Sequence, residues 1–369
     1  LRDSNPGHIS LSAGGVTRNV CENLARLGAD VKLLSCVGDD TFGTFIRRSC
    51  EDAGIDASHL YEAKGANSSM YLSILDADGD MLVGMSDMRI VQQDMPEDYL
   101  PSKKALIQGA GVVTCDPCMG EKTLLQLLDL CTPEQIVCVD PVSCAYARVV
   151  APFIGRFHTA KPNRMELGIL AGMEIQSDSD LERAGEAVLN KGLKRLFVSL
   201  GAEGCLYMDA AGTVLRRKLR PAKMVNASGA GDSFAAAMLY ATLHGFDVKK
   251  TLDYAMAAGI AAVSHERTIN PNMSTALLEE ISYTDATPSL AQAIKMKKFS
   301  NEGKLSHEVI ESIMSEEKPN QREKIVLRGD RVRNLIPKNI PINQTEEYVC
   351  KALEHYNKFL RNRAERDSR

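Results

Sequence analysis

Short apolar runs alternate with stretches of helical spacing over the part of the chain between residues 16 and 200. Residues 16–27 carry apolar side chains three or four positions apart, and Gly28 follows as a stop signal. Residues 42–53 repeat this pattern. Strand candidates lie at 31–37, 111–114, 136–139 and 195–200. Such alternation predicts an α/β fold in which helices cover a central, mostly parallel sheet.

A hairpin interrupts this rhythm. Residues 69–75 and 81–85 are strand candidates, and the Asp-Ala-Asp-Gly-Asp segment at 76–80 between them is rich in turn-forming residues. Strands of a parallel sheet are separated by long crossovers, so a tight hairpin is expected outside the main sheet. The sequence therefore predicts a small additional β-sheet beside the central one.

The character of the chain changes near residue 284. Residues 291–369 hold 17 Lys and Arg against 12 Asp and Glu, whereas the whole chain of 369 residues has a net charge of −4. Residues 346–363 have the spacing of a long amphipathic helix. We therefore expect a first domain at 1–283 and a basic, mainly helical extension at 284–369. A solvated helical face explains such a segment more often than nucleic-acid binding does.

Composition excludes several classes of protein. The 44% of hydrophobic and 25% of charged residues are ordinary for a globular chain. The longest apolar runs fall short of the ~18 residues of a membrane span, so no membrane association is expected. The ten cysteines are scattered, and several lie in apolar runs. They are typical of reduced, buried thiols, which indicates a cytoplasmic protein.

The strongest chemical signal lies at residues 226–234. Gly229, Ala230 and Gly231 precede an alanine-rich helical run, so backbone N–H groups at a helix start can face an anion. Asp232 falls in the first turn, where a carboxylate can accept a proton from a hydroxyl. An anion cradle beside a base suits phosphoryl transfer. The alternative is a tight helix entry with an ordinary N-terminal charge.

Two further motifs hold polar side chains near expected helix starts. Gly14 and Gly15 permit close backbone approach, and Asn19 offers donors and an acceptor to a polyhydroxylated ligand such as a sugar. Asn163 and Glu166 are three positions apart, so an amide and a carboxylate can hold hydrated Mg²⁺ near phosphates. The alternatives are a plain helix entry for the first motif and a capping box for the second.

A glycine-rich turn, Ser199-Leu-Gly-Ala-Glu-Gly204, directly follows a strand candidate. This arrangement is common at the nucleotide-facing edge of an α/β sheet. It is equally compatible with a plain hairpin turn.

Taken together and in this order, these elements resemble the ribokinase/PfkB family of sugar and nucleoside kinases. Residues 14–45 resemble the N-terminal signature of the family, residues 226–239 its C-terminal signature, and Asn163-x-x-Glu166 its magnesium-associated motif. Within the family, stretches such as Asn67-Ser-Ser-Met-Tyr-Leu-Ser73 and Asn270-Pro-Asn-Met-Ser274 most resemble pseudouridine kinases. The resemblance covers roughly residues 3–280.

The resemblance implies a ribokinase-like three-layer α/β fold with a small β lid, at about 1–14 and 66–90. It also implies roles for residues at matching positions. Asp232 would be the base, and Gly229, Ala230 and Gly231 the anion hole. The substrate would be held by Gly14, Gly15 and Asn19 and contacted by Ser69 and Asp87 from the lid. ATP would be bound by Ser199, Gly201, Gly204 and Asn226, and Mg²⁺ by Asn163 and Glu166 through water.

The chain departs from the family pattern in two ways. The family begins with a strand carrying Gly-x-x-Asn-x-Asp, and nothing in the chain matches it, so the first strand is expected to be missing. Asn226 stands where many members have Asp, which leaves the family's monovalent-cation stimulation open.

The leading functional hypothesis is ATP-dependent phosphorylation of the ribose 5′-hydroxyl of pseudouridine. Another sugar or nucleoside kinase of the family, for ribose or uridine, is the nearest alternative. Lid strands often pair across dimers in this family, so a homodimer through the lid is compatible with the sequence. The tail weakly resembles ParB-like partition proteins. A non-catalytic protein that binds DNA or a partner through the tail is the alternative from another class, although an appendage without a catalytic role explains the tail better.

Overall fold

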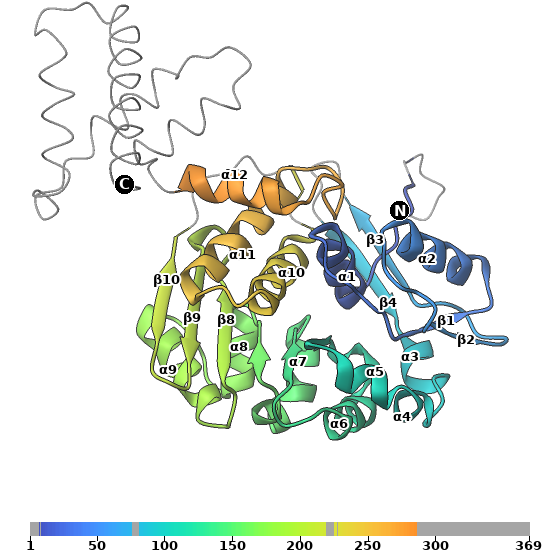
Figure 1. Ribbon diagram of the computed structural model, residues 1–369, viewed down its shortest axis with the longest axis horizontal. Coiled ribbons are helices and arrows are strands. Elements are labelled where there is room, and N and C mark those ends of the chain that lie inside the picture. The colour runs from blue at the N-terminus through green and yellow to red at the C-terminus, as the bar shows by residue number, and fades with distance from the viewer. Residues whose placement is uncertain (1–6, 8, 76–80, 219–224, 227, 286–369) are drawn as a thin grey trace, which may run out of the picture. The chain divides into compact units, whose positions relative to one another are not determined.

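The structure, a computed structural model, describes residues 7, 9–75, 81–218, 225–226 and 228–285 (Figure 1). Contacts divide the chain into two units, Leu1–Ser282 and Tyr283–Arg369. The tail predicted to be helical and basic, 286–369, lies outside the described residues, so its structure and role stay predictions. The elements below belong to the first unit, apart from the end of the last helix.

The main sheet has six strands in the order β10-β9-β8-β7-β6-β5. β5 to β8 run parallel, whereas β9 is antiparallel to both β8 and β10. The predicted α/β fold is confirmed, and its sheet is mixed because a hairpin-like turn joins β8 to β9. These strands are β5 (Val112–Cys115), β6 (Ile136–Val139), β7 (Thr159–Ala160), β8 (Arg195–Ser199), β9 (Cys205–Asp209) and β10 (Val214–Arg217).

Helices cover both faces of this sheet (Figure 1). The α-helices are α1 (Val16–Arg26), α2 (Thr41–Asp52), α3 (Arg89–Gln93), α4 (Tyr99–Ser102), α5 (Lys104–Gly109), α6 (Glu121–Leu130), α7 (Cys144–Val150), α8 (Arg164–Ala171), α9 (Asp178–Leu189), α10 (Ala230–Leu243), α11 (Val248–Val263) and α12 (Thr275–Asp285). Short 3₁₀ turns are η1 (Pro117–Met119), η2 (Ala151–Arg156) and η3 (Gly201–Glu203). In this described part of the chain, no helix has the length and apolar character needed to cross a membrane.

The three layers follow from side-chain alternation along the strands. On β8, Leu196 and Val198 enter the hydrophobic cluster shared with α6, α7, α8 and α9. Phe197, between them, enters the opposite cluster with α1, α10 and α11. β9 alternates in the same way, with Leu206 on the first face and Tyr207 on the second. β8 and β9 therefore each contribute to two cores, which explains why consecutive positions within them are apolar.

A two-stranded parallel sheet pairs β1 (Cys36–Gly38) with β2 (Tyr61–Ala63). The prediction of a strand over 31–37 was wrong in extent. Among the described residues, residues 31–33 exchange backbone hydrogen bonds with Asp56, and Lys32 forms an isolated bridge there. Val31 and Leu33 are buried beside Asp56, so their apolar character reflects burial rather than a longer β-strand.

The predicted hairpin is confirmed as β3 (Met70–Leu75) paired antiparallel with β4 (Met81–Asp87). Its apolar side chains are exposed at positions of both parities, including Tyr71 at 56%, Leu72 at 51% and Met85 at 64%. The described residues 9–14 form neither helix nor strand, and residues 1–6 and 8 lie outside the described residues, so the lid segment expected at 1–14 stays a prediction. The β3–β4 hairpin lies within the lid segment expected at 66–90.

Candidate active site

Charged side chains follow directly after the parallel strands of the main sheet. Asp116 follows β5, Asp140 follows β6 and Lys161 follows β7. Asn163 bridges to Ser199, the last residue of β8. The carboxyl ends of parallel strands meet at one edge of a sheet, where open α/β sheets bind their ligands. This edge is therefore the candidate site.

The helix that faces this edge, α10, begins with a turn that requires glycine. Gly229 is its N-cap, with a left-handed φ of 79°. A Cβ at this position would lie 2.0 Å from the carbonyl oxygen of Thr268. Asn226 anchors the approach, because its amide donates to the Glu266 carbonyl at 2.9 Å and its oxygen accepts from Ser228 N–H at 2.9 Å. The expected glycine-bounded helix entry is present.

The two motifs that carry Asn19 and Asp232 meet although 213 positions separate them in the sequence. Asn19 Nδ2 donates a hydrogen bond of 2.8 Å to Asp232 Oδ2. α1 packs beside α10 (Figure 1), and Ala235 and Ala236 of α10 are buried in a hydrophobic cluster that also holds side chains of α1. Small side chains let the two helix N-termini approach, which places the predicted sugar-binding amide against the predicted base.

The Asp232 carboxyl lies in an environment that disfavours its charge. Burial raises its pKa from 3.8 to about 6, and the Asp140 carboxylate adds to this rise. The hydrogen bond from Asn19 and the cations of Lys161 and Arg18 act in the opposite direction. A carboxyl with a pKa near 6 is ionised at neutral pH and still binds a proton readily, as a general base must.

A buried ion pair lies near this base, and no sequence motif marked its two residues. Lys161 Nζ lies 3.0 Å from Asp140 Oδ2, and the two residues are only 5% and 7% exposed. Burial opposes the charge of Lys161, but the carboxylates of Asp140, Asp232 and Glu166 together outweigh it and raise the pKa of the lysine. A Cβ on Gly231 would lie 3.3 Å from Lys161 Nζ. The ammonium group therefore borders the glycine turn.

The turn after β6 fixes Asp140 from a second side. Asp140 Oδ1 accepts a hydrogen bond of 3.0 Å from the backbone N–H of Val142. Val142 has a φ of 66°, a left-handed conformation that is costly for a β-branched residue. Backbone strain of this kind persists where surrounding contacts over-determine the geometry, which is common at functional sites.

Asn163 and Glu166 contact each other in the way expected from the alternative interpretation of their motif, a capping box. They form a reciprocal capping box at the start of α8, with hydrogen bonds of 2.9 Å and 2.8 Å. Glu166 is only 4% exposed, and burial together with the nearby Asp140 carboxylate raises its pKa. A buried carboxyl with a second one nearby favours a cation. Among the described residues, however, no cluster of three or more His, Cys, Asp or Glu side chains could bind a metal alone.

The glycine-rich segment from Ser199 to Gly204 is a turn that joins β8 to β9. Gly204 has a φ of 96°, and its carbonyl oxygen accepts from Leu200 N–H at 2.9 Å. A cavity of about 350 Å³ adjoins the turn. The lining residues of this cavity are Asp178, Leu200, Ala202, Glu203, Cys205, Arg216, Arg217 and Lys218.

The remaining expected ligand residues lie at the start of α1 and at the end of the lid. Gly15 is the N-cap of α1 with a φ of 99°, and Gly14 precedes it. Asp87, the last residue of β4, pairs with Met70 next to Ser69. Its hydrogen bonds with Arg89 lower its pKa to about 2. The Ser69 hydroxyl is buried without a hydrogen-bond partner in the described structure.

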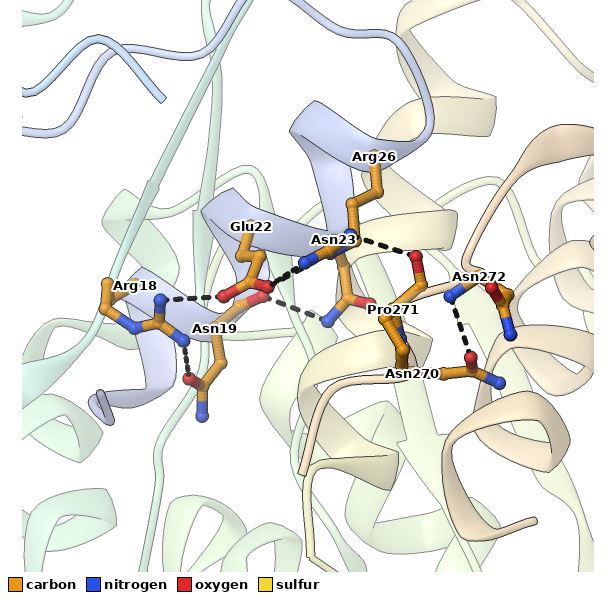
Figure 2. Close-up of polar contacts among 8 residues, drawn as sticks. All are labelled: Arg18, Asn19, Glu22, Asn23, Arg26, Asn270, Pro271 and Asn272. Carbon is orange, nitrogen blue, oxygen red and sulfur yellow. Dashed lines mark hydrogen bonds and ion pairs between the residues drawn. The ribbon is translucent and has the colours of Figure 1, made fainter. Parts of the chain in front are cut away.

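Further polar side chains on α1, which no sequence motif marked, form contacts around Asn19 and along the helix (Figure 2). Thr17 Oγ1 donates to Asp116 Oδ2 at 2.6 Å, which ties α1 to the end of β5. Arg18, Glu22 and Arg26 form two i,i+4 ion pairs along the helix. The only sequence signal for them was this spacing, which on most helices marks an exposed face.

Comparison with known proteins identifies the family. Residues 2–276 match the model of the pfkB family carbohydrate kinases. The chain belongs to the PfkB family. Pseudouridine kinase of Escherichia coli strain K12 is 34% identical over 274 residues, which cover 74% of this chain and 87% of that protein. This PfkB chain is therefore an ATP-dependent sugar or nucleoside kinase, a phosphotransferase with an alcohol group as acceptor.

Solved structures support the same fold. A Clostridium perfringens protein assigned as a sugar kinase is 33% identical, with a TM-score of 0.68, and the match covers 76% of this PfkB chain and 88% of that chain. Arabidopsis thaliana ribokinase, in a complex with ribose and ATP, is similar in fold at 20% identity and a TM-score of 0.66. That match covers 73% of this chain and 87% of the ribokinase chain.

Proposed function

We propose that this PfkB kinase transfers the γ-phosphoryl group of ATP to the ribose 5′-hydroxyl of pseudouridine. The observation that carries the catalytic part is the contact between Asn19 and Asp232 at the start of α10. Support for the nucleoside comes from the 34% identity with pseudouridine kinase. Other PfkB substrates, ribose and uridine among them, are the alternatives.

The residues divide the reaction between them. Asp232 accepts the proton of the substrate hydroxyl while the hydroxyl oxygen attacks the γ-phosphorus of ATP. The bond between the γ-phosphorus and the β–γ bridging oxygen breaks at the same time, which releases ADP. Backbone N–H groups of Gly229, Ala230 and Gly231 face the transferring group, whose charge α10 stabilises through its N-terminus. Lys161, which borders Gly231, supplies a cation at the same place. Gly14, Gly15 and Asn19 hold the ribose.

The other ligand residues follow the topology of the sheet edge. We assign ATP binding to the turn after β8, with Ser199, Gly201 and Gly204, and to Asn226 in the segment before α10. Ser69 and Asp87 approach the substrate from the lid. The Ser69 hydroxyl, which is buried without a hydrogen-bond partner among the described residues, suits a hydrogen bond with a ligand.

Asn163 and Glu166 fit a magnesium ion that is held mainly by phosphates and water. The capping box uses Oε2 of Glu166, and the Glu166 carboxylate lies near that of Asp140. Mg²⁺ commonly takes only one or two protein carboxylates in phosphoryl-transfer sites. Bound there, Mg²⁺ would neutralise charge on the ATP phosphates.

A substrate panel tests the function. ATP-dependent ADP release should be fastest with pseudouridine when uridine, ribose and adenosine are compared at equal concentration. The product should carry its phosphate at the 5′ position, as read by ³¹P–¹H correlation. Faster turnover of uridine or ribose would identify that compound as the substrate in place of pseudouridine. An absence of ADP release with all four compounds would contradict the proposed nucleoside.

Glu166→Gln separates the metal role from the capping role. Glutamine can keep the capping box but loses the charge, so the Mg²⁺ concentration for half-maximal rate should rise about 10-fold or more. Asp180→Asn is the matched control, because Ser177 and Asp180 form a similar box at the start of α9. An unchanged Mg²⁺ requirement in Glu166→Gln would assign Glu166 to capping alone.

A further inference from the structure

Arg18 is an unusual residue for the buried face of a helix. It is 6% exposed, and burial of a guanidinium is costly unless its charge and donors are satisfied. Its Nη1 donates to Glu22 Oε2 at 2.8 Å, and its Nη2 donates to Asn19 Oδ1 at 2.6 Å (Figure 2). The Nε atom is buried without a partner in the described structure. A residue held at this cost next to the site invites a functional explanation.

The bond from Arg18 decides which way the Asn19 amide faces. An arginine carries only donors, so the amide must present its oxygen to Arg18 and its NH₂ to the other side. That other side is Asp232, whose Oδ2 accepts from Asn19 Nδ2 at 2.8 Å. If the amide turned over, its NH₂ would face the guanidinium and its oxygen would face a carboxylate. Both contacts would then be repulsive.

We propose that Arg18 is a positioning residue, which holds the Asn19 amide in the orientation that donates to Asp232. The role rests on the proposed function only in taking Asp232 as the base. Glu22 anchors Arg18, so that the guanidinium is held from one side by a carboxylate and presents its other Nη atom to the amide.

Glu22 also binds a second arginine, which supplies a matched control. Arg26 Nη2 lies 2.7 Å from Glu22 Oε1, one helical turn beyond Glu22 on the side away from Arg18. Its Nη1 donates to the carbonyl oxygen of Pro271 at 3.0 Å (Figure 2). Loss of either arginine removes one cation from the same carboxylate, but only Arg18 holds the Asn19 amide.

The charges around Asp232 give the sign of the effect. Burial raises the pKa of Asp232, and so does Asp140, which follows β6. Asn19 and Arg18 from α1 lower it, as does Lys161, which follows β7. Removing Arg18 loses a cation and frees the amide, and both changes destabilise the carboxylate form. The pKa of Asp232 should therefore rise.

The test titrates the Asp232 carboxyl by ¹³C NMR in the ligand-free protein, with Asp232→Asn to assign the signal. Arg18→Met should raise the pKa by about one unit. Arg18→Lys keeps a cation beside Glu22, so it tests the role in a variant that retains this ion pair and its contribution to folding. It should shift the pKa of Asp232 in the same direction, but by less. Arg26→Met should titrate like the original protein.

The pH dependence of turnover is the second readout. If the pKa rises by about one unit, the loss of kcat/KM in Arg18→Met should be about five-fold larger at pH 6 than at pH 8. A purely structural defect would lower the rate equally at both pH values. An unchanged titration in both Arg18 variants, or an equal shift in Arg26→Met, overturns the positioning role. Shifted titration without turnover of any panel substrate would leave the positioning role standing and remove the proposed function instead.

Discussion

Asp232→Asn should lower kcat by about 10²–10⁴-fold, because an amide cannot accept the hydroxyl proton during phosphoryl transfer. The substitution is nearly isosteric, and its amide oxygen can still accept the hydrogen bond that Asn19 donates at 2.8 Å. Single-turnover measurement of ADP release with the best substrate of the panel checks the chemical step. A kcat within ten-fold of the original would place the base elsewhere.

The stability of this variant supplies its control. Burial raises the pKa of Asp232 from 3.8 to about 6, so the folded protein binds the proton more tightly than the unfolded chain. Stability from this group is therefore present below pH 4 and is lost as pH rises towards 6. Asp232→Asn removes this loss and should raise the free energy of unfolding at pH 7 by up to about 3 kcal/mol. Urea unfolding should show the gain at pH 7 and not at pH 4.

Much of the fold could be predicted because apolar periodicity reports burial. The β3–β4 hairpin and β6 lie where the sequence placed them, and α1 ends one residue before its predicted end. The extent of β1 could not be predicted in the same way. Val31 and Leu33 are as apolar as strand residues, but burial against a turn produces the same pattern as burial in a ladder.

The site could be predicted only where a motif marked it. Gly229 and Asp232 belong to a recognisable motif, and the structure brings Asn19 to them. Asp140 and Lys161 carry no such mark, because single charged residues at strand ends are common and their pairing depends on the order of β6 and β7 in the sheet. Arg18 was hidden for a related reason, since an i,i+4 pair with Glu22 looks like a solvated face until its burial is known.

Lys161→Met should cause the second large loss. It leaves Asp140 as a buried carboxylate without its cation, which should cost about 3–5 kcal/mol of unfolding free energy. It also removes an ammonium group that borders Gly231. In the original protein this ammonium group lowers the pKa of Asp232. Losing one preorganised donor to a developing charge should reduce kcat by about 10²–10³-fold. Urea unfolding and initial rates measure the two effects separately.

The double variant Lys161→Met/Asp140→Asn separates stability from catalysis. Removing the stranded charge should recover most of the stability, because neutral partners of similar size replace the buried pair with little net cost. The rate should stay low, since no cation returns to the glycine turn. Arg156→Met is the surface control: its pair with Asp129 is largely exposed, so its loss should cost less than about 1 kcal/mol. If activity returned together with stability, Lys161 would serve the fold alone and the anion site would consist of the backbone of α10.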